Sequence, residues 1–257
     1  MSNAEDRPGD ARTQLEVAAY YADPVQRLAF MRALFNRSAR YYDLVNLVVS
    51  LGSGAWYRRF CLRRSGVRPG VMVVDIATGT GLLAREAVTL TRDPAAIIGI
   101  DVSEAMLAIA QRNLGIALIQ ATAEALPLAP NSTDFVTMGY ALRHVADLHI
   151  AFAEALRILR PGGAMVLLEV SAPRNKILRA VAAGFMGELV PRLSQFFARD
   201  AKARLLMQYH WQTILSYMPP DVVMNVMKDC GFESVTCKSY LDLFHHYTGI
   251  KPPAEHQ

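Results

Sequence analysis

The chain has 257 residues, of which 52% are hydrophobic and 19% charged, and 27 Lys and Arg against 23 Asp and Glu give a net charge of +4. This composition supplies a full-sized core and excludes a disordered or low-complexity protein. No uninterrupted apolar run approaches the roughly 18–20 residues of a membrane-spanning helix. The low net charge and the lack of a recognised motif argue against nucleic-acid binding.

The cysteines and the N-terminus indicate the compartment. Cys61, Cys230 and Cys237 are widely spaced, and the sequence has no Cys-x-x-Cys or Cys/His cluster to hold a metal. We therefore expect a reduced cytoplasmic protein without a metal. Residues 1–12 are polar and lack the apolar stretch of a secretion signal, so we expect a disordered leader before a single domain at 13–257.

The predicted elements alternate along the chain. Apolar residues at intervals of three and four predict an N-terminal helical cap over 13–65. A β-branched run at 71–75 (VMVVD) predicts a buried strand that enters a glycine turn. The next elements expected are a helix at 82–90, a strand at 96–101, a helix at 103–113 capped by Ser103, strands at 117–121 and 135–140, a helix at 150–159, and a strand at 164–171 after a Pro-Gly-Gly turn.

This alternation is typical of an α/β protein with a Rossmann-like, doubly wound, mostly parallel sheet. Helical signal rich in Met and aromatic residues over 173–229 predicts an insertion that covers the carboxyl edge of the sheet. Strands at 234–240 and 243–250 complete seven strands. The expected divisions are the cap, a cofactor-binding core at 66–172, the insertion, and terminal strands at 230–257.

A glycine turn follows the first strand, where ligands of open α/β sheets bind. Gly79 and Gly81 let the backbone approach a ligand and expose amides at a helix N-terminus. Asp101 ends the next strand about twenty residues later, where it can accept hydrogen bonds from both ribose hydroxyls of a nucleoside. These residues predict a nucleoside cofactor.

The acid before the turn discriminates between cofactors. Residues 79–84 (GTGLLA) also fit the G-x-G-x-x-A pattern, so NAD or FAD stays an alternative. Asp75 would repel a pyrophosphate, whereas it would support the cationic end of S-adenosylmethionine. A structural cap of the turn is the other interpretation of Asp75.

Further segments point to a family. They are residues 42–50 (YDLVNLVVS), 75–81 (DIATGTG), 100–107 (IDVSEAML), 123–127 (AEALP), 157–163 (RILRPGG) and 169–171 (EVS). Over residues 35–171, and loosely at 230–232, the chain resembles class I S-adenosylmethionine-dependent methyltransferases, and among them the ubiquinone/menaquinone-biosynthesis C-methyltransferases. The resemblance implies S-adenosyl-L-methionine as cofactor, S-adenosyl-L-homocysteine as product, and no metal.

The resemblance also implies the cofactor-binding residues. It places the methionine end near the glycine turn, the ribose at Asp101, and the adenine beside Val102 and Met106, with Tyr42 closing over the site. Met106 on its own is more typical of a core residue. The full set is Tyr42, Asp75, Ala77, Thr78, Gly79, Gly81, Asp101, Val102, Met106, Thr122 and Ala123.

The substrate half departs more from the family pattern. Residues 50–56 (SLGSGAW) lack the family's His, and the Gly-Leu-Arg-Asn segment reads ALRH at 141–144. Arg143 is expected to stabilise a phenolate and His144 to act as the base that removes a ring proton. The structural alternative pairs Arg143 with Asp147 and makes His144 a partly buried structural residue.

The acceptor is expected to be a small apolar aromatic or prenylated compound, with methylation at a ring carbon of a quinol-type or phenolic ring. O-methylation of an aromatic natural product, a nicotinamide-dependent oxidoreductase and a non-catalytic binding module stay as alternatives. The expected substrate-binding residues are Tyr140, Arg143, His144, Tyr209 and Trp211. The Met-rich and aromatic stretch at 185–211 is either helical core or the wall of an acceptor pocket.

The sequence also contains a run of basic residues. Arg58, Arg59, Arg63, Arg64 and Arg68 alternate with apolar residues, which predicts a solvated helix face. Contact with an anionic lipid or a pyrophosphate is the alternative. Peripheral contact with a membrane surface therefore stays open.

Overall fold

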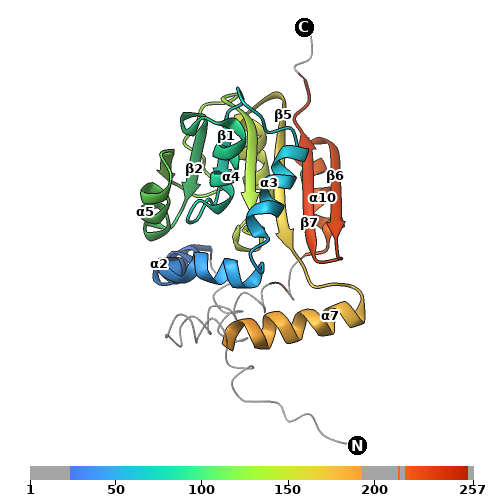
Figure 1. The fold of residues 1–257 in the computed structure, drawn as a ribbon. Coiled ribbons are helices and arrows are strands. Elements are labelled where there is room, and N and C mark those ends of the chain that lie inside the picture. The colour runs from blue at the N-terminus through green and yellow to red at the C-terminus, as the bar shows by residue number, and fades with distance from the viewer. Residues whose placement is uncertain (1–23, 193–213, 215–217, 254–257) are drawn as a thin grey trace, which may run out of the picture.

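The computed structural model describes residues 24–192, 214 and 218–253 (Figure 1). The predicted leader at 1–12 and the predicted substrate residues Tyr209 and Trp211 lie outside these residues. The helices are α2 (Pro24–Val49), α3 (Gly54–Arg64), α4 (Leu82–Thr91), η1 (Pro94–Ala96), α5 (Glu104–Asn113), η2 (Leu142–His144), α6 (Leu148–Ile158), α7 (Lys176–Ala182), η3 (Ala183–Leu189) and α10 (Pro220–Asp229). The strands are β1 (Val73–Ile76), β2 (Ile97–Asp101), β3 (Ala117–Gln120), β4 (Thr133–Gly139), β5 (Leu159–Val170), β6 (Glu233–Tyr240) and β7 (Phe244–Ile250).

The strands form one seven-stranded sheet in the order β3-β2-β1-β4-β5-β7-β6. The first five strands run parallel, and β7 is antiparallel to both β5 and β6. The chain moves outward from β1 to β3 and then returns to place β4 on the other side of β1. This reversal puts the topological switch point beyond the carboxyl ends of β1 and β4, and it confirms the predicted Rossmann-like sheet.

Strand residues alternate between two apolar cores, one on each face of the sheet. On one face, Val73 and Val166 pack with Leu62 of α3 and Ala84 of α4. On the other face, the strand residues adjacent in sequence to Val73 and Val166 pack with Phe152 of α6 and with Val223, Val226 and Met227 of α10. Because α10 fills this second core, the end of the predicted insertion is part of the layered α/β body.

Two elements lie beyond the carboxyl ends of the parallel strands rather than on a sheet face. Figure 1 shows α2 and the helix that runs from α7 into η3 at this edge, with the sheet above them. The side chain of Asn36 on α2 accepts a hydrogen bond from the Ser103 hydroxyl (2.6 Å), which ties α2 to the start of α5. The predicted helical cover of this edge is thus present in the described residues.

The sequence placed the elements close to their observed ends, with one clear error. The Pro-Gly-Gly segment at 161–163, which we expected to be a turn, lies inside β5, where the register with β4 shifts between Thr133 and Phe135. Backbone hydrogen bonds between Gly162, Gly163 and Lys251 hold these residues against the C-terminal segment as a bulge. The predicted cap of α5 is confirmed, because the Ser103 hydroxyl accepts a hydrogen bond from the amide of Met106 (3.2 Å).

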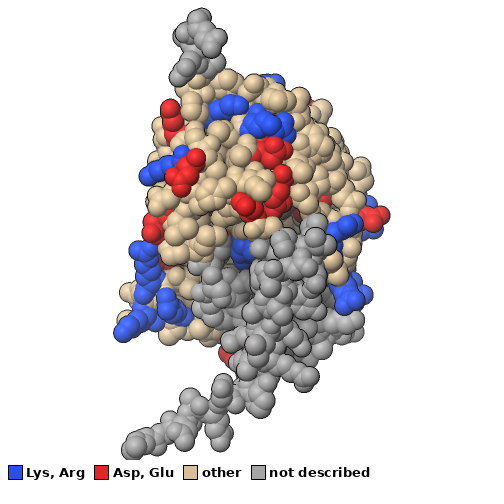
Figure 2. Space-filling view, turned by 180° about the vertical axis from the view of Figure 1, so that it is seen from behind, with Lys and Arg blue, Asp and Glu red and all other residues tan. Residues whose placement is uncertain are grey.

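The described surface carries charges of both signs. On the face shown in Figure 2, Lys and Arg are interspersed with Asp and Glu over the part that is not grey. Among the described residues, no helix is both long and apolar enough to cross a membrane.

Candidate active site

The turn after β1 has left-handed backbone at three positions. Ala77, Gly79 and Gly81 have φ angles of 53°, 58° and 87°. Glycine adopts this region freely, whereas an alanine there is strained. At Gly79 a side chain would project into open space toward Tyr42, whose ring is 4.0 Å from the position of its Cβ. The turn therefore leaves room for a ligand against the backbone.

Asp101 at the end of β2 fastens this turn. Its two carboxylate oxygens accept hydrogen bonds from the amides of Gly79 (2.8 Å) and Ser103 (2.8 Å). Burial raises the pKa of this carboxyl, while the two amides act in the opposite direction. Each carboxylate oxygen keeps a further lone pair, so Asp101 can also accept hydrogen bonds from a pair of vicinal hydroxyls.

A cavity of about 390 Å³ lies beside Asp101 at the switch point, and we call it the glycine-turn cavity. The predicted cofactor residues that line it are Tyr42, Ala77, Gly79, Asp101, Val102, Met106, Thr122 and Ala123. Lining residues that the sequence did not single out include Phe35, Glu124, Gly139 and Ala141. Residues from α2, β1, β2, α5 and the loops after β3 and β4 thus meet around one space.

Three of the predicted cofactor residues, Asp75, Thr78 and Gly81, do not line this cavity. Both carboxylate oxygens of Asp75 accept hydrogen bonds from hydroxyls, at 2.7 Å from Thr78 and 2.6 Å from Thr137. Burial raises the pKa of Asp75 to about 6. Asp75 thereby links β1, the turn and β4.

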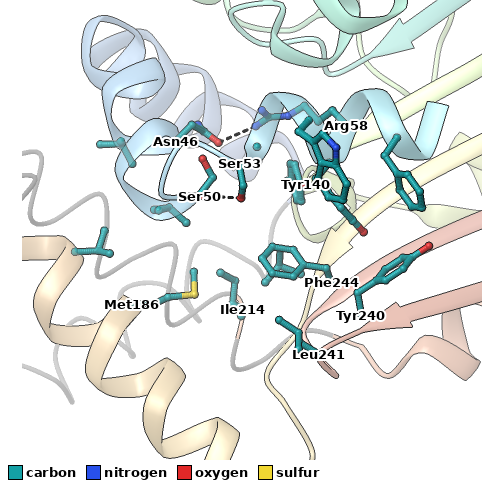
Figure 3. A pocket seen from close by; sticks show the side chains of 18 of the residues that line it. Asn46, Ser50, Ser53, Arg58, Tyr140, Met186, Ile214, Tyr240, Leu241 and Phe244 are labelled. Carbon is teal, nitrogen blue, oxygen red and sulfur yellow. Dashed lines mark hydrogen bonds between the residues drawn. The ribbon is translucent and has the colours of Figure 1, made fainter. Parts of the chain in front are cut away.

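A second cavity of about 340 Å³ adjoins the first, and we call it the apolar cavity (Figure 3). Its apolar wall includes Val45, Val49, Trp56, Phe60, Val170, Met186, Val190, Ile214, Leu241 and Phe244. Tyr42 and Tyr140 line both cavities, so they stand where the two spaces meet. Two different molecules can therefore lie next to each other across these tyrosines.

Tyr140 has an unusual backbone conformation, which sets the position of its side chain. Its φ is 59°, in the left-handed region that side-chain-bearing residues seldom occupy. Its amide donates a hydrogen bond to the carbonyl of Leu168 (2.6 Å), which fixes the chain as it leaves β4. Burial raises the pKa of the Tyr140 hydroxyl, and also that of Tyr42, so both rings stay neutral at physiological pH.

The two predicted catalytic residues face different cavities. Arg143 lines the apolar cavity, and His144 lines the glycine-turn cavity with its ring edge-on to Phe35 at 5.3 Å between centroids. Arg143 forms an ion pair with Glu169 (3.4 Å), a buried residue that also accepts the amide of Leu142 (2.7 Å). Asp147, the partner expected in the structural alternative, caps the start of α6 and accepts hydrogen bonds from the amides of His149 and Ile150.

The sequence missed Arg58, whose guanidinium lines the apolar cavity. The predicted solvated face is correct for Arg59, Arg63, Arg64 and Arg68, but Arg58 is only 7% exposed. The buried positions of α3 are Gly54, Arg58, Cys61 and Leu62, which are four, three and one residues apart. This helical spacing places Arg58 on the apolar stripe, and it was the signal available in the sequence.

Comparisons with known proteins agree with this architecture. Residues 25–248 match the sequence model of the ubiE/COQ5 methyltransferase family. The chain is 32% identical over 216 residues to a ubiquinone/menaquinone biosynthesis C-methyltransferase UbiE of Shewanella halifaxensis, covering 81% of this chain and 85% of the relative. With the UbiE of Shewanella baltica strain OS155 it shares 30% identity over 224 residues, or 84% and 88% of the two chains.

Solved structures share the fold. An S-adenosylmethionine-dependent methyltransferase of Thermotoga maritima, described as a possible histamine N-methyltransferase, superposes with a TM-score of 0.60 at 23% identity, covering 86% of this chain and 99% of that one. A phosphoethanolamine N-methyltransferase of Haemonchus contortus, solved with S-adenosylhomocysteine, has a TM-score of 0.60 at 17% identity and covers 86% and 60% of the two chains.

The family match decides against the oxidoreductase alternative, since it covers most of the chain and names a methyltransferase. The two UbiE relatives carry methyltransferase names as well. Within the described residues no group of three or more His, Cys, Asp or Glu is placed to hold a metal ion. The chain belongs to the ubiE/COQ5 methyltransferase family and is an S-adenosylmethionine-dependent methyltransferase.

Proposed function

We propose that the chain transfers a methyl group to a ring carbon of a quinol-type or prenylated phenolic acceptor held in the apolar cavity. The observation that carries the proposal is the pair of adjoining cavities with Tyr42 and Tyr140 between them. One cavity has the polar groups that fit a nucleoside, and the other is lined mainly by aliphatic and aromatic side chains. The UbiE relatives are named for quinone biosynthesis, which supports the same class of acceptor.

The glycine-turn cavity fits S-adenosylmethionine by the chemistry of its wall. The free lone pairs of Asp101 suit the ribose hydroxyls, and Met106, Val102 and Ala123 offer apolar contact to the adenine. The left-handed Gly79 lets the methionine portion lie against the backbone of the turn. Asp75 acts on this cofactor through the turn that it braces, because its carboxylate is engaged by Thr78 and Thr137.

The bound cofactor supplies an electrophilic methyl group on a sulfonium. The protein must hold the acceptor carbon opposite that methyl group and exclude water, which is most of the catalytic task in an in-line displacement. An electron pair of the ring carbon forms the new carbon–carbon bond, and the carbon–sulfur bond breaks with its pair left on sulfur. The ring then loses a proton to a base and regains aromaticity.

Arg143 and His144 are our candidates for two of these tasks. Arg143 lines the apolar cavity, where its guanidinium can act on acceptor oxygens, although its pairing with Glu169 already offsets much of its charge. His144 is our candidate for the base, reached from the side of the glycine-turn cavity. Replacing His144 by Ala should lower turnover far more than cofactor affinity, and unchanged turnover at all pH values would remove it from the mechanism.

The rim of the apolar cavity supports an acceptor with an apolar tail. Trp56 and Leu241 line the cavity and are nevertheless 67% and 75% exposed, so the wall continues onto the molecular surface. Leu47 and Leu51, near the end of α2, are also exposed. A tail longer than the cavity could extend along this surface, and contact with a membrane stays a prediction.

The experiment is methyl transfer from S-adenosyl-[methyl-13C]methionine to an alkylated hydroquinone by the purified protein. We expect a product whose 13C resonance is that of an aryl methyl group. A resonance in the methoxy range would establish O-methylation instead. No labelled product from apolar phenols, with the cofactor bound, would overturn the proposal.

A further inference from the structure

A buried cation lies in the wall of the apolar cavity. The side chain of Arg58 rises from the middle of α3 and donates a hydrogen bond to the amide oxygen of Asn46 on α2 (3.2 Å). Its guanidinium lies over the ring of Tyr140, 5.6 Å from the ring centre. Figure 3 shows Arg58 and Tyr140 on one side of the cavity, opposite Met186 and Ile214.

No carboxylate offsets this charge within the described lining of the cavity. The ionisable lining residues are Tyr42, Tyr57, Arg58, Tyr140, Arg143 and Tyr240. Burial raises the pKa values of Tyr42, Tyr57 and Tyr140, so these hydroxyls stay neutral and supply no negative charge. Arg143 has Glu169 as its counter-ion, whereas the hydrogen-bond acceptor found for Arg58 is a neutral amide.

A buried cation is costly unless it is paired, because it loses its hydration. The contact with the Tyr140 ring offsets only a part of that cost. An anion that enters the cavity would restore the balance, and the guanidinium would meet it with charge-assisted hydrogen bonds. The binding of an anionic group is therefore favoured at Arg58.

The guanidinium of Arg58 occupies space that a side chain at Gly54 would fill. Gly54 lies one helical turn before Arg58, and a Cβ at Gly54 would be 3.0 Å from Nη1 of Arg58 and 3.0 Å from the hydroxyl of Ser50. A larger residue there would displace the arginine or the serine. The lack of a side chain at Gly54 and the hydrogen bond to Asn46 therefore keep the guanidinium in a defined position in the ligand-free protein.

We propose that Arg58 binds an anionic oxygen of the methyl acceptor, either a phenolate or an enolate. This inference rests on the proposed function and adds the ionisation state of the substrate to it. The acceptor hydroxyl gives its proton to solvent, Arg58 keeps its own protons and donates hydrogen bonds, and the charge on oxygen raises the electron density at the neighbouring ring carbons. Arg58 thus selects the form of the acceptor that is nucleophilic at carbon.

The test uses 4-heptyl-2-nitrophenol, a phenol that ionises near neutral pH and whose phenolate absorbs visible light. Absorbance is titrated against pH with the probe bound to the full chain in the presence of S-adenosylhomocysteine. The bound probe should ionise at a lower pH with the wild type than in water, because a cation beside a hydroxyl lowers its pKa. An apolar cavity without an available cation would do the reverse, so this wild-type result alone can overturn the proposal.

Variants locate the charge. With Arg58→Gln, the pKa of the bound probe should rise by about one to two units, and the Kd of the ionised probe should increase about 10- to 100-fold. Arg58→Lys should restore part of the shift, since it keeps the charge without the fork of donors. The matched control is Arg63→Gln, which removes the same charge from an exposed position on α3 and should behave as the wild type.

Four results would overturn the assignment: no binding of the ionised probe, a raised pKa with the wild type, an equal loss in Arg63→Gln, or an Arg58→Gln variant indistinguishable from the wild type. If methyl transfer proceeds in any of these cases, only the role of Arg58 falls. If the labelled-methyl experiment on phenols fails while the probe behaves as expected, the anion site stands and the proposed acceptor falls.

Discussion

Replacing Asp101 should weaken cofactor binding strongly in a protein that still folds. The perturbation is Asp101→Ala, which deletes the acceptor for the amides of Gly79 and Ser103 and the acceptor that we propose for two ribose hydroxyls. A hydrogen bond to a charged group contributes about 1.5–3 kcal/mol, so losing two of them costs at least about 3 kcal/mol of binding free energy. At about 1.4 kcal/mol for each factor of ten, the Kd should rise about 100-fold or more.

The same change should lower stability by a separate amount. The amides of Gly79 and Ser103 would lose their acceptor, at about 1–3 kcal/mol each when the group stays buried. For a chain of this size, the sum of about 2–6 kcal/mol corresponds to a decrease in Tm of about 4–24 °C. Binding must therefore be measured well below the new Tm, where the variant is folded.

The assay is isothermal titration calorimetry with S-adenosylhomocysteine, together with thermal unfolding of the ligand-free protein. Asp101→Asn should fall between the wild type and the alanine variant, because it keeps one acceptor oxygen. The matched control is Asp93→Ala, at the other end of β2, which removes an exposed helix cap and should leave the Kd unchanged. A folded Asp101→Ala variant with the Kd of the wild type would refute the ribose role.

Three further predictions concern the groups around the two cavities. Burial raises the pKa of Asp75 from 3.8 to about 6, so the native state binds more protons than the unfolded state across this window, and this carboxyl lowers stability as pH rises through it. The free energy of unfolding of Asp75→Asn minus that of the wild type should therefore increase by about 3 kcal/mol between pH 3.5 and pH 7. Urea denaturation at the two pH values measures this difference. A difference that stays constant with pH would contradict the raised pKa of Asp75. Ala77→Gly removes the strain of a left-handed alanine and should stabilise the chain by about 1 kcal/mol in the same measurement, whereas a loss of stability would show that the methyl group matters more than the strain. Glu169→Ala should cost about 3–5 kcal/mol in thermal unfolding because it removes the buried carboxylate that pairs with Arg143, and a loss below about 1 kcal/mol would mean that the pair is not desolvated.

The cofactor half of the molecule could be predicted because its signals are local in the chain. A β-branched run, a glycine turn and a helix follow one another within about twenty residues, and topology then dictates that Asp101 ends the neighbouring strand at the same edge. The left-handed φ angles of Gly79 and Gly81 are the physical content of that turn. The sequence therefore located most of the glycine-turn cavity without any long-range information.

The acceptor half was less predictable because it is assembled from distant segments. The apolar cavity takes its wall from α2, α3, η3 and the ends of β5, β6 and β7, and no single stretch of sequence contains that pattern. Arg58 was assigned to solvent because charged residues seldom lie on the buried face of a helix. Asp75 was expected at the ligand, but the hydroxyls of Thr78 and Thr137, one of them 62 residues away, engage its carboxylate.

The central claim is that one cavity holds the methyl donor and its neighbour holds the acceptor ring, with Tyr42 and Tyr140 between them. The most direct measurement is an X-ray structure of the protein with S-adenosylhomocysteine and an alkylated hydroquinone bound together. We predict the ribose hydroxyls at Asp101, the ring in the apolar cavity with an oxygen at Arg58, and a ring carbon facing the sulfur past the two tyrosines. A ring bound elsewhere, or nucleoside in the apolar cavity, would contradict the account.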